Sequence, residues 1–223
     1  MVPLPIPPEL EPAGSIPAPA FQPGAPAAPA GRRVLDVVGR VRTTLRETRY
    51  QHTTDVDERA GRYAWDCSGM AAWILRRAAP RALAAVAAER PVARDFYQVI
   101  ARAGPAPYRT AWHRLSGVSE LRPGDLFAWV RPPKWPSRNT GHVGFVLSRA
   151  EPVAVVPQAY ALRVVDATSL PHQDDTRAAD GAGGFGEGTL LLMTDADGKP
   201  TAYGWYGTES RAVIETKIVL GRL

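Results

Sequence analysis

At residues 66–77 the chain reads DCSGMAAWILRR, and this stretch decides much of the fold. Asp66 is a residue type that begins helices, because its carboxylate accepts hydrogen bonds from the free N–H groups of the first turn. The apolar side chains that follow recur three and four positions apart, which places them on one helical face: Met70, Trp73 and Ile74. The pattern predicts an amphipathic helix from Cys67 to about Arg77.

An earlier segment has the same periodicity. From Arg32 onward the apolar residues are spaced by four, three and four positions, and they are Val34, Val38, Val41 and Leu45. This spacing predicts a first helix with one buried face. A polar stretch from Thr48 to Gly61 separates the two helices.

Residues 1–30 differ in composition from the rest of the chain. They hold 10 of the 22 prolines, many alanines and only two charged residues, Glu9 and Glu11. Such a segment cannot bury a core or form regular ladders, so we expect a disordered Pro/Ala-rich arm before a domain at 31–223. The arm is interpreted as a linker or tether, with a proline-rich ligand for a partner as the alternative. It has no basic start followed by an apolar run, so no export signal is recognisable, and a removed leader would leave the same sequence.

Two further helices and a series of strands follow. Helices are predicted at 81–89 and 92–102, the second with its apolar face on Phe96, Val99 and Ile100. After Glu120 the pattern changes to short apolar runs separated by turn residues, which predicts strands at 126–130, 142–147, 162–166, 189–193 and 202–205 and a last strand at 214–220. Helices followed by strands indicate an α+β domain with an antiparallel sheet of about five or six strands.

The composition excludes several classes of protein. The chain has 27 basic and 22 acidic residues, a net charge of +5, and no run of Lys and Arg interleaved with aromatics, so we expect no nucleic-acid partner. No window approaches the roughly 18 continuous apolar residues of a membrane span. With one cysteine, the chain has neither an internal disulfide nor a cysteine-rich zinc site, and we expect no metal or organic cofactor.

That single cysteine, Cys67, stands at the predicted start of a helix. Backbone N–H groups and the positive end of the helix dipole stabilise a thiolate there. Ser68 and Gly69 keep the helix start small enough for a substrate carbonyl to approach, and the N–H of Cys67 can donate to an oxyanion. The alternative is a buried, inert thiol.

A base and an orienting group can be assigned from the strands. His142 begins a strand between Gly141 and an apolar run, and it is the histidine best placed to act as base for Cys67, although a structural core histidine is the alternative. Asp166 ends the next strand, where an antiparallel sheet would put it beside His142. His172, six residues later, is the competing orienting residue. Asp174 and Asp175 are interpreted as solvated loop charges.

Three fragments in this order resemble the NlpC-like cell-wall cysteine peptidases of the papain-like group. They are Asp66-Cys67-Ser68-Gly69 opening a helix, Leu121-Arg122-Pro123-Gly124-Asp125-Leu126 before a strand, and Gly141-His142-Val143-Gly144 in the following strand. The resemblance covers roughly residues 48–167. It implies a papain-like core in which Cys67 is the nucleophile, His142 the base and Asp166 the third polar residue, where the family commonly has histidine or asparagine.

The resemblance also implies a tyrosine upstream of the cysteine that assists the oxyanion site. Tyr50 is the nearest match and Tyr63 competes with it. The aromatic-Gly-Gly sequence that usually follows the tyrosine is replaced here by Gln51-His52-Thr53-Thr54.

The long segment 171–188 is expected to rim the cleft, because irregular segments of that length in compact domains commonly carry function. Arg177 in this segment, with Arg131, Lys134 and Arg138 before His142, can bind substrate carboxylates, the alternative being solvated surface charge. Two motifs are dismissed. Gly181–Gly186 reads G-x-G-x-x-G but leads into a strand rather than a helix, and 195–198 resembles the start of a calcium loop but has Tyr206 where the bidentate Glu belongs.

Together these residues predict a cysteine peptidase or amidase that hydrolyses an amide bond through a Cys67 thioester. The resemblance implies a peptidoglycan stem peptide as substrate and hence an extracytoplasmic, bacterial cell-wall setting. Two alternatives stay open: a non-catalytic wall- or partner-binding module that retains the fold, and a papain-like amidase or acyltransferase acting on another substrate. The bond that is cut and the oligomeric state are not determined by the sequence.

Overall fold

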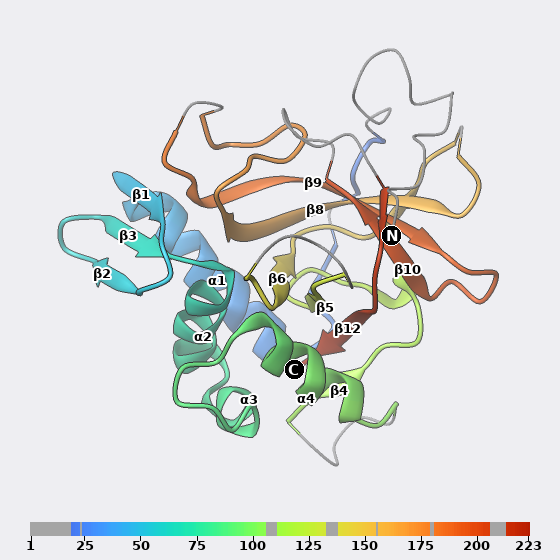
Figure 1. Ribbon diagram of the computed structural model, residues 1–223, viewed down its shortest axis with the longest axis horizontal. Helices are drawn as coiled ribbons and strands as arrows, with labels where there is room; N and C mark the ends of the chain where they lie inside the picture. Colours follow the sequence, from blue (N-terminus) through green and yellow to red (C-terminus); the bar gives the residue numbers. More distant parts are fainter. Residues whose placement is uncertain are drawn as a thin grey trace.

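The computed structural model describes residues 19–22, 24–105, 111–132, 138–154, 156–178, 181–205 and 213–223. Within them the fold is α+β, as the sequence predicts, with four helices grouped on one side of the strands (Figure 1). The helices are α1 (Pro29–Thr44), α2 (Cys67–Ala78), α3 (Pro80–Ala85) and α4 (Ala93–Arg102), and a short 3-10 turn, η2, spans Val118–Glu120.

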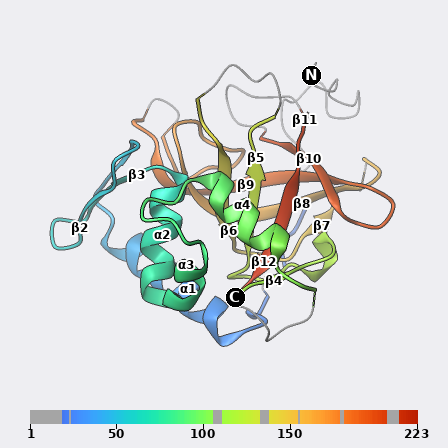
Figure 2. The same cartoon turned by 60° about the horizontal axis from the view of Figure 1, so that its bottom comes forward.

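The two helices with the clearest periodicity form as predicted. Helix α1 buries its valine face against α2, and Asp66 caps α2 by accepting a hydrogen bond from the N–H of Gly69 at 2.7 Å. Met70, Trp73 and Ile74 are buried. Figure 2 shows α1, α2 and α3 gathered at one end of the molecule.

The third helix is shorter than the predicted 81–89. It ends at Ala85, and Ala87 has a φ of 56°, in the left-handed region that a helix cannot continue through. The fourth helix agrees with its prediction and buries Phe96 and Ile100.

The main sheet is larger than the predicted five or six strands. Among the described residues it has nine, all paired antiparallel, in the order β11-β10-β9-β8-β6-β5-β12-β4 with β7 beside β8. The strands are β4 (His113–Arg114), β5 (Leu126–Val130), β6 (Gly141–Val146), β7 (Glu151–Pro152), β8 (Ala159–Thr168), β9 (Gly184–Thr194), β10 (Pro200–Gly204), β11 (Val213–Glu215) and β12 (Ile218–Arg222).

This sheet curls on itself. One face packs against the helices through residues such as Val143, Phe145 and Val165. On the other face, Trp129 of β5 stacks on Tyr203 of β10 with ring centroids 4.2 Å apart, although several strands lie between them in the sheet order. The curled sheet therefore encloses a second apolar cluster that the helices do not cover.

The curl explains why the predicted last strand, 214–220, is two strands. β11 pairs with β10, whereas β12 pairs with β5. Thr216 lies between them and joins both sides, because its N–H donates to the carbonyl of Thr201 and its hydroxyl donates to the carbonyl of Val130.

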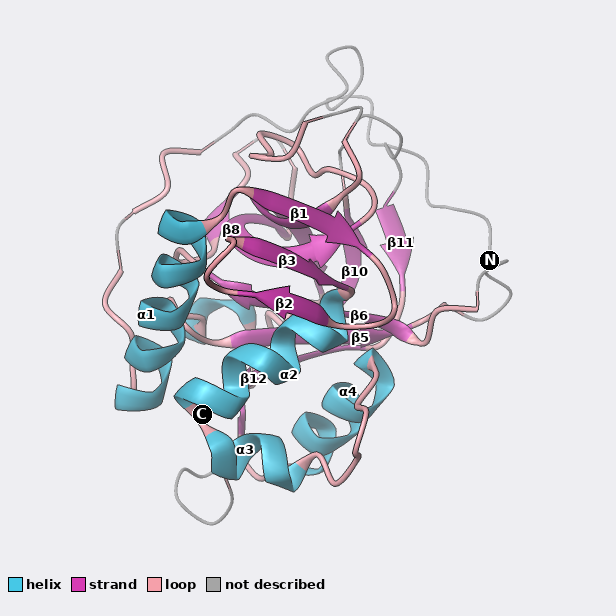
Figure 3. Ribbon diagram, turned by 90° about the vertical axis from the view of Figure 1, so that its left-hand side faces the viewer, coloured by secondary structure: helices cyan, strands magenta, loops and turns pink. Residues whose placement is uncertain are grey.

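A second, three-stranded sheet occupies the stretch interpreted from sequence as a polar segment between two helices. β1 (Glu47–Tyr50) runs parallel to β3 (Arg62–Trp65), and β2 (Asp55–Asp57) pairs antiparallel with β3. Figure 3 shows this small sheet broadside, with α1 at its side and α2 below it. Thr48 attaches it to the main sheet by accepting a hydrogen bond from the N–H of Phe185 at 2.8 Å.

The described N-terminal residues pack on the domain. Phe21 is partly buried against the apolar cluster between β8, β9 and β10, and α1 begins at Pro29, before the boundary predicted at residue 31. The rest of the predicted arm, residues 1–18 and 23, lies outside the described residues.

The Leu121–Leu126 fragment has a structural role. Gly124, at φ 90°, lies so close to the start of α1 that a Cβ would meet the carbonyl oxygen of Gly31 at 2.5 Å. Asp125 is buried and forms a bidentate ion pair with Arg222, at 2.9 and 2.7 Å. This pair joins the turn before β5 to the end of β12.

We expect Arg222→Gln to lower the free energy of unfolding by about 3 kcal/mol, because it leaves the buried Asp125 carboxylate without its charged partner. The double variant Asp125→Asn/Arg222→Gln should recover part of that loss. Urea unfolding measures both, with Arg40→Gln on the exposed side of α1 as control. A loss below about 0.5 kcal/mol for Arg222→Gln would place the pair among ordinary surface ion pairs.

Candidate active site

Cys67 is the first residue of α2, as predicted, and it lines a cleft of about 750 Å³. The Asp66 carboxylate is occupied by the helix cap, since it accepts hydrogen bonds from Gly69 N–H and from the Ser68 hydroxyl at 2.9 Å. Ser68 lines the cleft as well, but its hydroxyl already donates to Asp66. The sulfur is thus next to a well-ordered helix start.

Position 69 must be a glycine because a neighbouring turn lies close to it. A Cβ at this position would lie 2.3 Å from the hydroxyl of Thr54, in the turn between β1 and β2. This turn, which includes His52 and Thr53, forms one wall of the cleft beside the thiol. His52 also contacts the cap, with Nδ1 3.2 Å from Asp66 Oδ2.

His142, the predicted base, is held between the thiol and a carboxylate. Its Nε2 is 2.7 Å from Asp166 Oδ2, and its ring is close enough to Cys67 for the sulfur to raise the pKa of the imidazole. Because Asp166 occupies Nε2, Nδ1 is the ring nitrogen left for the sulfur. The rings of Trp129 and Trp205 lie 5.0 and 5.1 Å from the imidazole and keep most water from it.

The register of the sheet brings His142 and Asp166 together. Phe145 of β6 pairs with Val165 of β8, so Gly144 lies opposite Asp166, and His142 is two residues further along the same face. A Cβ at Gly144 would be only 3.0 Å from the Cβ of Asp166 and 2.6 Å from the Phe127 ring. The glycine that follows the His-Val pair therefore makes room for the carboxylate.

Asp166 is fully buried and has three charged or polar partners. Oδ2 is 2.7 Å from the Nε2 of both His142 and His172, and Oδ1 accepts from the Arg177 guanidinium. Burial alone would raise the pKa of this carboxyl, but the positive charges of His172, Arg177 and His142 hold it well below its usual range. Asp166 is thus an anion at neutral pH.

The pKa of His142 is shifted in the opposite direction. Burial lowers it, but the charges of the Cys67 thiolate and of Asp166, with the hydrogen bonds to both, outweigh burial and raise it to about 10. An imidazolium bonded to the Asp166 carboxylate is the charge state that this geometry favours.

The two residues considered for orienting His142 act at different places. Asp166 contacts the imidazole directly, whereas His172 lies on the far side of Asp166 and stacks on Trp205 with centroids 3.8 Å apart. Among the described residues, Nδ1 of His172 is buried without a hydrogen-bond partner. Asp166 is therefore the polar group that fixes the ring of His172.

The expectation that Arg177 binds substrate is wrong. Its side chain is 3% exposed and donates to the Asp166 and Asp175 carboxylates and to the carbonyls of Gly184 and Gly186. Asp175, expected to be a solvated loop charge, is buried in the same ion pair. Arg177 belongs to the support of Asp166.

Alternating glycines in β9 create the space for this support. A Cβ at Gly186 would lie 2.5 Å from the Arg177 side chain, and one at Gly188 would lie 2.4 Å from the Cβ of His172. Both glycines are on the face that carries Asp166, since Gly186 pairs with Asp166 in the sheet. The predicted loop 171–188 thus includes the first part of a strand, and Gly181–Gly186 leads into that strand as expected.

Tyr50 is at the cleft and Tyr63 is not. Tyr50 lines the cleft, and its pKa is raised above the ordinary value for tyrosine by burial and by the nearby negative charges of Cys67, Asp66 and Asp166. Its hydroxyl therefore stays protonated and able to donate. Tyr63 is buried under α2 and bonds to the Thr44 hydroxyl, so its competing oxyanion role is wrong.

Of the arginines and lysine expected before His142, Arg138 lines the cleft. Arg131 is not among the described residues that line it. Lys134 and Tyr206 lie outside the described residues. The turn at 195–198 joins β9 to β10, and its Asp195 carboxylate accepts from the N–H groups of Asp197 and Lys199 as a hairpin turn requires.

Trp205 was not anticipated from the sequence. It follows β10 and packs on both His142 and His172, so it covers their shared carboxylate from solvent. A single Trp at a strand end carries no local signal of such a role. The alternation of Gly184, Gly186 and Gly188 was a readable signal, because glycine at every second position leaves one face of a strand empty.

Within the described ranges, no three metal-binding side chains gather in a way that would hold an ion, and no helix is long and apolar enough to cross a membrane. The site has a thiol at a helix N-terminus, a buried imidazole near it and a carboxylate bonded to the imidazole. Such an arrangement can generate a thiolate and transfer a proton to a leaving group.

The fold and the site thus define an α+β protein with a Cys-His-Asp arrangement beside a cleft. No model of a known protein family matches the chain, and no solved structure matches it. It is 30% identical, over an alignment of 212 residues, to uncharacterized protein R653 of Acanthamoeba polyphaga mimivirus, covering 79% of this chain and 88% of the viral protein. The chain belongs to the same family as that viral protein.

We expect the His142 ring to remain protonated from acidic pH to about pH 10, as its raised pKa requires. Cys67→Ala removes one of the negative charges, so the pKa of His142 should fall by about one pH unit or more. Asp166→Asn should lower it too. NMR titration of the ring protons measures this, with His142→Gln assigning the signal; a wild-type midpoint near 6.5 that Cys67→Ala leaves unchanged would contradict the ion pair.

We expect Gly188→Ala to destabilise the protein by about 2 kcal/mol, because the new methyl group would displace His172 from Asp166. Gly39→Ala is the matched control. No atom lies within 4 Å of a Cβ at that position of α1, so alanine should increase stability by about 0.5–1 kcal/mol. Urea unfolding compares the two, and equal effects would mean that Gly188 is not needed for the packing of His172.

Proposed function

We propose that the chain is a cysteine hydrolase with a papain-like catalytic core, which cleaves an amide bond through a thioester on Cys67. One observation carries the proposal: the chain's single thiol, at the first turn of α2, lies close enough to the His142 imidazole to raise its pKa, and that imidazole is bonded to a buried carboxylate.

In the first step the Cys67 thiolate attacks the amide carbonyl. The developing oxyanion is stabilised by the N–H of Cys67 and by the Tyr50 hydroxyl, and loss of one such donor typically costs about a hundredfold or more in rate. His142, already protonated, gives its Nδ1 proton to the leaving amine, and the C–N bond breaks to leave a thioester.

In the second step a water molecule attacks the thioester, and His142, now neutral, takes a proton from that water. The acid product leaves, and the thiolate and imidazolium are restored. Asp166 holds the Nε2–H through both steps, so the ring keeps one tautomer and one orientation while its charge changes. Trp205 and Trp129 exclude water from this pair, which strengthens the attraction between imidazolium and carboxylate.

As substrate we propose a peptide stem of peptidoglycan, with the protein acting outside the cytoplasm. The motifs at Asp66–Gly69, 121–126 and Gly141–Gly144 support this, as does the basic net charge, which favours an anionic polymer. An acyltransferase would use the same first step and differ in the acceptor that resolves the thioester.

The buried support of Asp166 favours a catalyst over a non-catalytic binding module. A carboxylate with two histidines and an arginine around it, all buried, is costly to assemble and adds nothing to a binding surface. The charge of this carboxylate acts on the imidazole of His142, which faces the thiol.

We expect the protein to release new fragments from purified peptidoglycan and Cys67→Ala to release none, as measured by mass spectrometry. His142→Gln should reduce the rate by a factor of at least about a hundred, because the proton transfer is lost. Fragments produced equally by Cys67→Ala would sink the mechanism. If no fragments appear but Cys67 is still alkylated rapidly, the substrate is a molecule other than peptidoglycan.

A further inference from the structure

The cleft continues from Cys67 along one face of α2. Besides Cys67 and Gly69 in the first turn, the residues of this helix that line the cleft are spaced by four: Ser68, Ala72 and Arg76. Residues four apart lie one above another on a helix, so this face offers two small side chains and then a guanidinium. An extended chain can lie along the small residues and end at Arg76.

Two loops form the opposite wall. Residues 89–93 precede and begin α4, and residues 138–141 lead into β6. A hydrogen bond from the N–H of Arg94 to the Thr140 hydroxyl, at 3.4 Å, joins the two segments. They bring Arg90 and Arg138 to the cleft, the second only four residues before His142.

The three cleft arginines are exposed and uncommitted. Within the described part of the chain, the side chains of Arg76, Arg90 and Arg138 make no hydrogen bond or ion pair, whereas those of Arg177 and Arg222 each bind carboxylates. The acidic residues lining the cleft are Asp66, which caps α2, and Glu89. The free charge facing a bound molecule is therefore positive.

We propose that this arm of the cleft, along α2, binds a carboxylate of a peptide substrate, through Arg76, Arg90 and Arg138. The inference rests on the proposed function, since it places the scissile amide at Cys67. Arg76 is nine residues along α2 from Cys67, about 13 Å at 1.5 Å per residue. An extended peptide advances about 3.3 Å per residue, so the carboxylate is about four residues from the bond that is cut.

The spacing and charge together make an acidic peptide the preferred substrate. Guanidinium groups pair with carboxylates through two parallel hydrogen bonds, which gives geometric selectivity in addition to charge. A cleft of about 750 Å³ has room for a short peptide of that length. A neutral peptide of the same length would leave three guanidinium groups without a partner.

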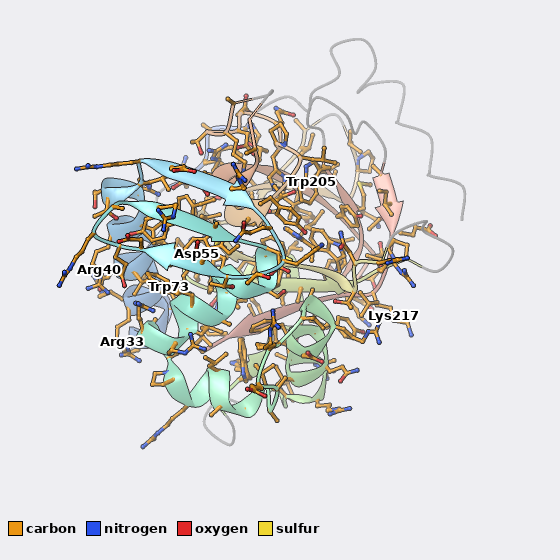
Figure 4. All side chains as sticks on the ribbon, turned by 60° about the vertical axis from the view of Figure 1, so that its left-hand side comes forward. Arg33, Arg40, Asp55, Trp73, Trp205 and Lys217 are labelled. Carbon is orange, nitrogen blue, oxygen red and sulfur yellow. The ribbon has the colours of Figure 1, made fainter. Side chains whose placement is uncertain are left out.

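Matched peptide probes test this without a known substrate. Two series of probes are used: N-chloroacetyl tetrapeptide amides, and peptidyl chloromethyl ketones that extend to the other side of the sulfur. Each series places one Glu at each position in turn, and every Glu probe has a counterpart with Gln at the same position. Cys67 displaces chloride to form a thioether, and the mass of the protein reports the reaction, since the chain has one cysteine. Arg76→Gln/Arg90→Gln/Arg138→Gln is the variant. Arg40→Gln, on the exposed side of α1 at the edge of the molecule, is the control (Figure 4).

We expect at least one Glu probe to react about tenfold faster than its Gln counterpart with the wild-type protein. The triple variant should lose this preference while reacting with iodoacetamide at the wild-type rate, and Arg40→Gln should keep it. A Glu-to-Gln ratio within twofold at every position, or a ratio that survives in the triple variant, would overturn the proposal.

These outcomes are separate from failure of the proposed function. Fast alkylation by iodoacetamide without a Glu preference removes the carboxylate site and leaves the cysteine hydrolase. If the thiol reacts slowly with every reagent, the proposed function fails, and competition binding of the same Glu and Gln peptides to Cys67→Ala then decides whether the arginines bind carboxylates.

Discussion

The buried carboxylate of Asp166 is the group on which the rest of the site depends. Taken alone, a carboxyl in this position would be driven by burial to its neutral form. Arg177 and the two histidines keep it an anion, and as an anion it raises the pKa of His142. The charge on the imidazole that faces the thiol therefore depends on groups that do not line the cleft.

Much of the main sheet serves this one group. Gly144 and Gly186, on the strands either side of β8, leave space where a side chain would collide with Asp166 or Arg177. The curl of the sheet brings β10 back so that Trp205 packs on His142 and His172. The helices, on the other face, contribute the thiol and the small residues that line the cleft.

The sequence was sufficient where a signal is local. Periodicity and turn residues were enough to predict Asp66 as the cap of α2, the strand that carries His142, and the position of Asp166 beside it. What was missed depends on pairing between distant segments: the parallel pair of β1 and β3, the curl that splits β11 from β12, and Trp205. Arg177 was assigned to substrate binding because the space that Gly186 and Gly188 leave for Arg177 and His172 becomes evident only once β9 is paired with β8.

The rate at which iodoacetamide alkylates Cys67, measured from pH 5 to 9, tests the central claim most directly. If His142 and Asp166 hold a thiolate, the wild-type protein should react rapidly near pH 6 with little further rise, and His142→Gln and Asp166→Asn should each slow the reaction at that pH. A rate that climbs with pH toward the value of about 8.5 typical of a free thiol, and that neither substitution changes, would contradict the account.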